Sequence, residues 1–171
     1  MNKLLLLVLL IPACVLSQDI KIDETDGFTG QRYIETTIVS LKSAYANGIG
    51  LSLSASGAHL LLNIVGYGDG IGVIKKTDKI FLLMEDGMII TATSIGDQPE
   101  NEGGLTRVFQ HHFLIRKKDL EEIFTKQTRL VRISTSAGNR DIPVSKKNSK
   151  ELKKSGQILL KALAKQPSSV K

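Results

Sequence analysis

The sequence predicts an α+β protein made mainly of antiparallel β-sheet, as a sandwich or a curled sheet, with one short helix and one C-terminal amphipathic helix. Three observations support this fold class. Several short segments alternate apolar and polar residues with the period of two that is typical of strands. Turn residues separate these segments, and helical spacing is confined to the last third of the chain. Because helices between most strands are missing, a doubly wound parallel sheet is excluded.

The length of 171 residues fits a single domain. A hydrophobic fraction of 42% and a charged fraction of 23% are ordinary for a globular protein, which disfavours disorder, collagen-like repeats and coiled coil. The single cysteine excludes a disulfide framework and a four-cysteine metal site. We therefore expect one β-rich domain over residues 18–166 and a frayed tail at 167–171.

Residues 1–17 have the pattern of a cleaved signal peptide. Lys3 precedes an apolar stretch from Leu4 to Leu16, whose 13 residues fall short of the roughly 20 that span a membrane. Cleavage after Ser17 would release Gln18 as the new N-terminus, and the alternative is a lipoprotein site with lipid on Cys14. The sequence thus predicts a periplasmic or extracellular protein without a transmembrane segment after cleavage.

The first predicted strands lie on either side of Gly57-Ala58. Leu51 to Ser56 alternates leucine or alanine with serine, which indicates one dry face and one wet face. His59 to Tyr67 is apolar on both sides at Leu60 to Leu62, as in a central strand. A turn at Gly57-Ala58 would pair the two.

Two further hairpins are predicted from turn residues between apolar runs. Residues 79–84 and 88–95 flank Glu85-Asp86-Gly87, and an Asp-Gly turn in this setting is a strong hairpin signal. Residues 130–135 and 141–144 flank Ser136 to Asn139 in the same way. Leu105 to Ile115 is another long strand candidate.

Helical spacing predicts a short helix over Asp119 to Thr125 and a long helix near the C-terminus. Asn148, with Glu151 three residues later, resembles a capping box. Leu152, Leu159 and Leu163 form one apolar face of the long helix, which we expect to pack on the sheet.

The candidate metal and phosphate sites are weak. Gly66 to Gly72 lacks the spacing and the following helix of a nucleotide-binding loop, so a turn or bulge is favoured. His111 and His112 are adjacent on a predicted strand and point to opposite faces, so they do not share a metal with His59. We expect His111 to be packed beside Phe109 and Phe113, and His112 to be exposed.

The acidic loop at residues 97–104 contains Asp97, Glu100 and Glu102, which we interpret as solvated acids because the calcium-loop spacing is missing. The three tyrosines Tyr33, Tyr45 and Tyr67 occur at unrelated spacings, unlike a sugar-stacking platform. The sequence carries none of the common hydrolase motifs, and no serine stands beside a readable base. We predict no catalytic residue, no metal site and no cofactor, and the binding residues stay unknown.

Charge is divided unequally along the chain. Residues 18–106 have a net charge of −6 and residues 107–171 a net charge of +11. A basic half can attract polyanions, although much of it is interpreted as a solvated helix face. We expect no nucleic-acid partner, because the exported chain has few aromatic residues and no nucleic-acid-binding motif.

Asp26-Gly27-Phe28-Thr29-Gly30, followed by Ile34-Glu35-Thr36, is similar to the openings of uncharacterised secreted or periplasmic proteins of the Bacteroidota type. Their C-terminal hairpin and Lys-rich helix also resemble Arg129 to Leu163. The resemblance covers about a third of the chain. It implies a location and a fold, and no activity.

We therefore predict an exported, non-enzymatic β-rich domain that binds another cell-envelope component or a polyanion. One alternative is a small-molecule or lipid carrier, in which the strands surround an unfilled cavity. Another is a hydrolase with two carboxylates facing each other across a cleft. The oligomeric state is not predicted.

Overall fold

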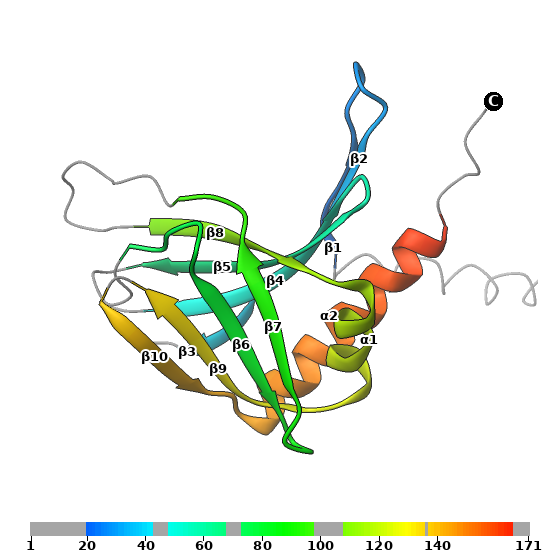
Figure 1. Ribbon diagram of the computed structural model, residues 1–171. Coiled ribbons are helices and arrows are strands. Elements are labelled where there is room, and N and C mark those ends of the chain that lie inside the picture. The colour runs from blue at the N-terminus through cyan, green and yellow to red at the C-terminus, as the bar shows by residue number, and fades with distance from the viewer. Residues whose placement is uncertain (1–19, 43–47, 68–72, 98–107, 136, 166–171) are drawn as a thin grey trace, which may run out of the picture.

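A computed structural model describes residues 20–42, 48–67, 73–97, 108–135 and 137–165. These residues form ten strands and two helices (Figure 1). In chain order the strands are β1 (Ile20–Thr25), β2 (Arg32–Thr36), β3 (Val39–Lys42), β4 (Ile49–Ser56), β5 (His59–Tyr67), β6 (Lys79–Met84), β7 (Ile89–Ser94), β8 (Val108–Ile115), β9 (Thr128–Thr135) and β10 (Gly138–Pro143). The helices are α1 (Lys117–Thr125) and α2 (Lys146–Ala164). This confirms the predicted α+β class.

All strands belong to one antiparallel sheet with the order β1-β2-β4-β5-β8-β7-β6-β9-β10. β3 also pairs with β4, at residues 49–51, whereas β2 pairs with β4 at residues 54–56. β2 and β3 are therefore two halves of one neighbour to β4. The sheet is open but bends so far that β10 comes close to β3. Of the two expected arrangements, the structure has the curled sheet.

The core lies on the inner face of this sheet. On β6, Ile80, Leu82 and Met84 point inward and are 0% exposed, while the residues between them are half-buried. Leu152 and Leu159 of α2 are also 0% exposed and belong to the same apolar cluster. The predicted apolar face of the C-terminal helix thus packs on the sheet, which is the usual way to bury an amphipathic helix.

Each of the predicted hairpins is present. β4 and β5 turn at Gly57, and β6 and β7 turn at Gly87, with φ angles of +56° and +86°. Glycine is favoured there because a side chain strains this left-handed conformation. β9 and β10 form the third hairpin, at the predicted place.

The start of α2 differs from the predicted one. The N-cap is Ser145, whose side-chain oxygen accepts a hydrogen bond from the backbone N–H of Asn148 at 3.1 Å. Asn148 is therefore the third residue of the helix rather than its cap. Serine at this position satisfies an N–H that has no partner within the helix, and the helix gains an earlier start.

The predicted wet face of β4 is also wrong for two of its serines. Ser52 and Ser54 are 0% exposed. Alternation along a strand separates two faces, but whether the second face meets water depends on the neighbouring strands and loops. In this fold the small serine side chains are covered and bond to polar groups of β2 and β5.

No helix within the described part of the chain is both long enough and apolar enough to cross a membrane. The predictions for residues 1–17, for the glycines at 68–72, for most of the loop at 97–104 and for the tail at 167–171 lie outside the described residues.

Candidate functional site

The β1–β2 hairpin extends beyond the body of the molecule, and Phe28 lies at its tip (Figure 1). The relative exposure of this side chain is 103%, so it meets only water. Exposed single apolar residues are common on proteins. Phe28 stands out because the turn that carries it is ordered by several hydrogen bonds.

Asp26 organises this turn. Its Oδ1 atom accepts hydrogen bonds from the backbone N–H groups of Phe28 and Thr29, both at 2.8 Å, and its backbone oxygen accepts one from Gly30 at 2.8 Å. Such side-chain bonds to the following backbone are the reason why Asp is favoured in turns. The bonds from Thr29 and Phe28 lower the pKa of the Asp26 carboxyl. These hydrogen bonds hold the backbone that carries Phe28, and the ionised form of Asp26 is the stronger acceptor.

The base of the hairpin is tied to the rest of the molecule. The Arg32 guanidinium forms two hydrogen bonds of 2.7 Å with the carboxylate of Asp23 and a third, of 3.2 Å, with the backbone oxygen of Ala162 in α2. Gln31 also donates to the Ser56 hydroxyl at 3.0 Å, beside the β4–β5 turn. These contacts brace the projecting strands against α2 and β4.

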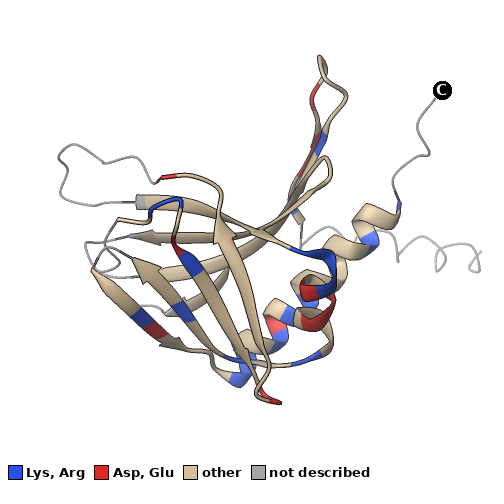
Figure 2. Ribbon diagram, in the orientation of Figure 1, with Lys and Arg blue, Asp and Glu red and all other residues tan. Residues whose placement is uncertain are grey.

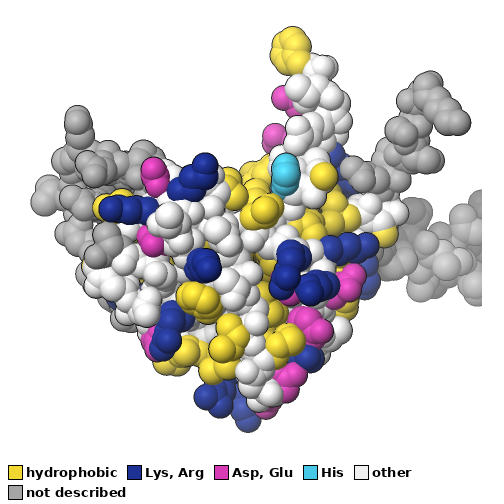
Figure 3. All heavy atoms as spheres, viewed as in Figure 1, with side chains coloured by type: hydrophobic (Ala, Val, Ile, Leu, Met, Phe, Trp, Pro, Cys, Tyr) yellow, Lys and Arg dark blue, Asp and Glu magenta, His cyan; other side chains and the backbone are white. Residues whose placement is uncertain are grey.

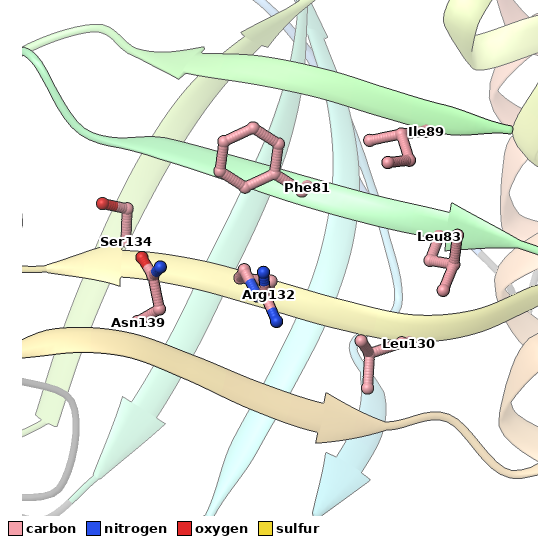
Figure 4. Close-up of a pocket in the computed structure, with 7 residues that line it drawn as sticks. All are labelled: Phe81, Leu83, Ile89, Leu130, Arg132, Ser134 and Asn139. Atoms are coloured by element: carbon pink, nitrogen blue, oxygen red, sulfur yellow. The ribbon is translucent and has the colours of Figure 1, made fainter.

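A second feature is an apolar groove on the outer face of the other half of the sheet (Figure 4). It has a volume of about 410 Å³. Its lining comes from β6, β7, β9 and β10: Phe81, Leu83, Ile89, Leu130, Arg132, Ser134 and Asn139. The groove arises because β6 has Phe81 and Leu83 on its outer face, with Ile89 of β7 and Leu130 of β9 among the other apolar residues of the lining. The unbroken apolar run from Ile80 to Met84 is visible in the sequence. It does not indicate which of these side chains remain exposed to solvent in the fold.

The polar edge of this groove is a bidentate ion pair. Arg132 Nε and Nη2 donate to the two carboxylate oxygens of Asp141, each at 2.6 Å. The pair raises the pKa of Arg132 and lowers that of Asp141. Both side chains are nearly half exposed, at 46% and 43%. Ile89, on the opposite side of the groove, is 61% exposed.

The structure brings together one serine and one histidine that the sequence does not associate. Ser94 Oγ lies 2.7 Å from His111 Nε2, and both residues are buried. Such a pair can act as nucleophile and base only if the imidazole nitrogen is free to accept the hydroxyl proton. Ser94 instead donates to the backbone oxygen of Gly96 at 2.6 Å, so His111 Nε2 must carry the hydrogen and donate to Ser94. This pair closes the end of β7 and is not poised for catalysis.

His111 and His112 point to opposite faces, as predicted. His111 packs on the inner face, with its ring edge against Phe113 at a centroid distance of 5.1 Å. The expectation that His112 is exposed is wrong, because its side chain is half-buried. Its Nδ1 is 2.8 Å from Oδ1 of Asn63 on the adjacent strand β5.

Asn63 belongs to a buried polar network on the outer face of β2, β4, β5 and β8. Its amide nitrogen donates to Ser52 at 3.2 Å and to Ser54 at 3.0 Å, and Ser52 donates to the Glu35 carboxylate at 2.8 Å. Tyr33, one of the three tyrosines, donates to the other Glu35 oxygen at 3.0 Å. Every buried polar side-chain atom of the described residues has a partner. The polar groups of this network are therefore hydrogen-bonded to one another, and these bonds help to fix the register of the strands.

The predicted acidic cluster is only partly described. Asp97 accepts a hydrogen bond from the backbone N–H of Lys76 at 2.6 Å, whereas Glu100 and Glu102 lie outside the described residues. Within the described residues, no three His, Cys, Asp or Glu side chains are placed to hold a metal ion. Tyr45 and the side chain of Tyr67 lie outside the described part of the structure.

Comparison of the chain with family models, with curated proteins and with solved structures gives no match. The hairpin tip and the apolar groove remain as the surface features that indicate a function.

Proposed function

We propose that the mature chain is an exported, non-enzymatic binding domain that recognises another cell-envelope component through the tip of its β1–β2 hairpin. The observation that carries this proposal is the full exposure of Phe28 on a turn held by the Asp26 side chain. An aromatic side chain left in water forgoes roughly 1.5–3 kcal/mol of burial energy. Aromatic residues are enriched in the cores of interfaces, where that energy is recovered.

The rigid base of the hairpin supports the same reading. A backbone turn that is already ordered loses little conformational entropy when a partner covers it. Phe28 is presented by an ordered turn, and Arg32 connects the strand behind it to α2. The hairpin is thus prepared for binding before it meets a partner.

Two described features favour this proposal over the alternatives. The inner side chains form one continuous apolar cluster, and the groove lies outside the sheet, which favours binding on the surface over a carrier cavity. The carboxylates of Asp23, Asp119 and Asp141 each bond to an arginine, and the buried Glu35 bonds to hydroxyl groups. Asp86 and Glu122 each bind Lys126 Nζ at 2.8 Å, so an ammonium group lies between these two carboxylates, where a glycoside hydrolase needs room for the sugar.

Site-specific photo-cross-linking in the cells that make the protein tests the proposal. A benzophenone-bearing phenylalanine replaces Phe28, and the same residue replaces Glu121, an exposed position on α1, as the matched control. We expect one discrete adduct with an envelope component from position 28 and none from position 121. Equal adducts from both positions, or none from position 28, contradict the proposal.

Mass spectrometry of the protein isolated from these cells tests export. A mass that corresponds to a chain starting at Gln18, or at a lipid-modified Cys14, supports export, since both need removal of the leader. A cytosolic chain that retains Met1 contradicts it.

A further inference from the structure

The hairpin tip and the apolar groove lie at different ends of the sheet. The tip joins β1 and β2, which begin the strand order, whereas the groove lies on β6, β7, β9 and β10, which end it. In Figure 1 the hairpin points away from these four strands. Phe28 is therefore presented away from the groove of its own molecule.

We propose that the protein self-associates head to tail, with Phe28 of one copy inserted into the apolar groove of a second copy. The inference uses the same hairpin tip as the proposed function, but it needs no envelope component. Its first support is a match of shape and chemistry. A cavity of ~150 Å³ lined by Leu, Ile and Phe takes up a benzene ring. The groove, at about 410 Å³, has four such residues, Phe81, Leu83, Ile89 and Leu130, beside the polar Arg132, Ser134 and Asn139, and it has room for a phenyl ring.

The second support is charge complementarity. Residues 23–30 carry Asp23, Glu24 and Asp26 and no basic residue; Asp23 is paired with Arg32, which leaves Glu24 and Asp26 as the tip carboxylates without an ion pair among the described residues. On the outer face of the groove half, Lys79 and Arg132 are exposed, with Asp141 as the paired acid. Figure 3 shows basic side chains beside the hydrophobic ones on this side of the molecule. An acidic tip is therefore attracted to the neighbourhood of the groove before Phe28 enters it.

Arg132 offers a specific contact for the incoming tip. Its Nε and Nη2 atoms bind Asp141, and that pair does not use Nη1. A guanidinium has five N–H donors, so a second carboxylate can bind without displacing the first. Glu24 is exposed near the hairpin tip and is the carboxylate that we assign to this contact.

This contact joins two different surfaces, so it does not close on itself as a two-fold dimer does. Such heterologous contacts produce rings or open chains of molecules. Because a hairpin tip covers a small area, the association is weak and depends on concentration. It becomes significant where many copies are held close together, as on one membrane surface.

Sedimentation velocity of the purified chain 18–171, from micromolar to millimolar concentration, tests the inference. We expect the weight-average sedimentation coefficient of the wild type to rise with concentration. Phe28→Ser, the tip variant, removes the aromatic side chain from the hairpin tip. Ile89→Glu, the groove variant, places a carboxylate in the groove at an exposed position. Each variant alone is expected to stay monomeric. Ile95→Ser, at a site that is 50% exposed and outside both surfaces, is the control and should behave as the wild type.

An equimolar mixture of the two variants provides the decisive measurement. The groove variant still has an intact tip, and the tip variant still has an intact groove, so the mixture should form a heterodimer that cannot extend. Ile89→Lys should lose less association than Ile89→Glu, because it keeps the attraction for an acidic tip.

A wild type that stays monomeric to millimolar concentration overturns the inference, as does a Phe28→Ser variant that associates like the wild type. A mixture without heterodimer, from variants with unchanged circular dichroism, also overturns it. These failures leave the envelope partner of the proposed function untouched. Conversely, cross-links from position 28 to other copies of the chain alone would support self-association and contradict the envelope partner.

Discussion

His111 shows how one buried side chain makes stability depend on pH. Desolvation lowers its pKa, with a smaller contribution from the neighbouring His112, while Asp78 and Asp97 act in the opposite direction. The folded state therefore favours the neutral ring, and burial is the main reason. The pKa of His112 is lowered as well, mainly by burial.

We predict that the melting temperature falls on mild acidification. In the unfolded chain His111 binds a proton near the ordinary histidine pKa of 6.5, whereas in the folded chain it does so only at a lower pH. The contribution to stability is thus complete above 6.5 and is lost as the pH falls through the lower pKa of the folded state. Melting curves from about pH 8 to about pH 5 measure the effect. The pKa values of Asp23, Asp26 and Asp141 are lowered from 3.8, so these groups titrate below this window.

The variant His111→Gln should have a flatter profile of melting temperature against pH, because it removes one of the two rings whose pKa is lowered by burial. A profile as steep as that of the wild type would show that His111 is not responsible.

At the scale of residues, local pattern predicts which side of a strand a side chain occupies but not what covers it. The opposite orientation of His111 and His112 follows from the period of two. The contact between His112 and Asn63 joins residues 49 positions apart and depends on the pairing of β5 with β8. For the same reason, the sequence did not associate Ser94 with His111.

Among the elements, α2 begins at a different cap residue than the sequence pattern predicts: the cap is Ser145 and not Asn148. Ser145 accepts from the backbone of Asn148 by its side chain, and Asn148 takes part through its backbone. Loss of a capping side chain usually costs about 1 kcal/mol. α2 also packs its buried face on the sheet, so destabilising its first turn weakens the whole domain.

We predict that Ser145→Ala lowers the free energy of unfolding by about 1 kcal/mol, within the usual range of roughly 0.5–2 kcal/mol for lost caps. Asn148→Ala, the matched control, should change the free energy of unfolding by much less, because residue 148 keeps the backbone N–H that donates to the Ser145 hydroxyl. Urea denaturation of both variants is the measurement. A larger loss for Asn148→Ala would restore the capping role that the sequence pattern suggests for this residue.

The hairpins were the most predictable elements. Glycine and aspartate between apolar runs mark a turn whose backbone conformation few other residues adopt. The projection of the β1–β2 hairpin was less predictable, since residues 26–30 look like any polar turn. It depends on how far β1 and β2 extend beyond the strands beside them.

The whole molecule combines a basic C-terminal half with an acidic N-terminal half. Many of the basic residues lie on α1 and α2 (Figure 2). On α2, Lys150 and Lys161 are exposed, opposite the face that contains Leu152 and Leu159. This arrangement follows from amphipathicity, yet it also creates a surface that attracts polyanions.

We predict weak, salt-sensitive retention of the chain 18–171 on heparin. Exposed charges are screened within about 10 Å at 0.1 M salt, so retention should fall steeply as salt rises. Replacing both Lys150 and Lys161 with Gln should reduce retention, and replacing Lys75 and Lys76, exposed on another segment, should reduce it less. Retention that does not change with salt would exclude an electrostatic origin.

The amino-acid sequence by itself determined the α+β class, the three tight-turn hairpins, both helices and the inward position of His111. These features depend on neighbours a few residues apart, and local periodicity records them. Tertiary structure alone decided the strand order, the covered serines of β4, the Ser94–His111 pair and the groove outside β6 and β9. Each of these depends on residues brought together from distant positions, and an alternating pattern carries no record of which strand its partner will be.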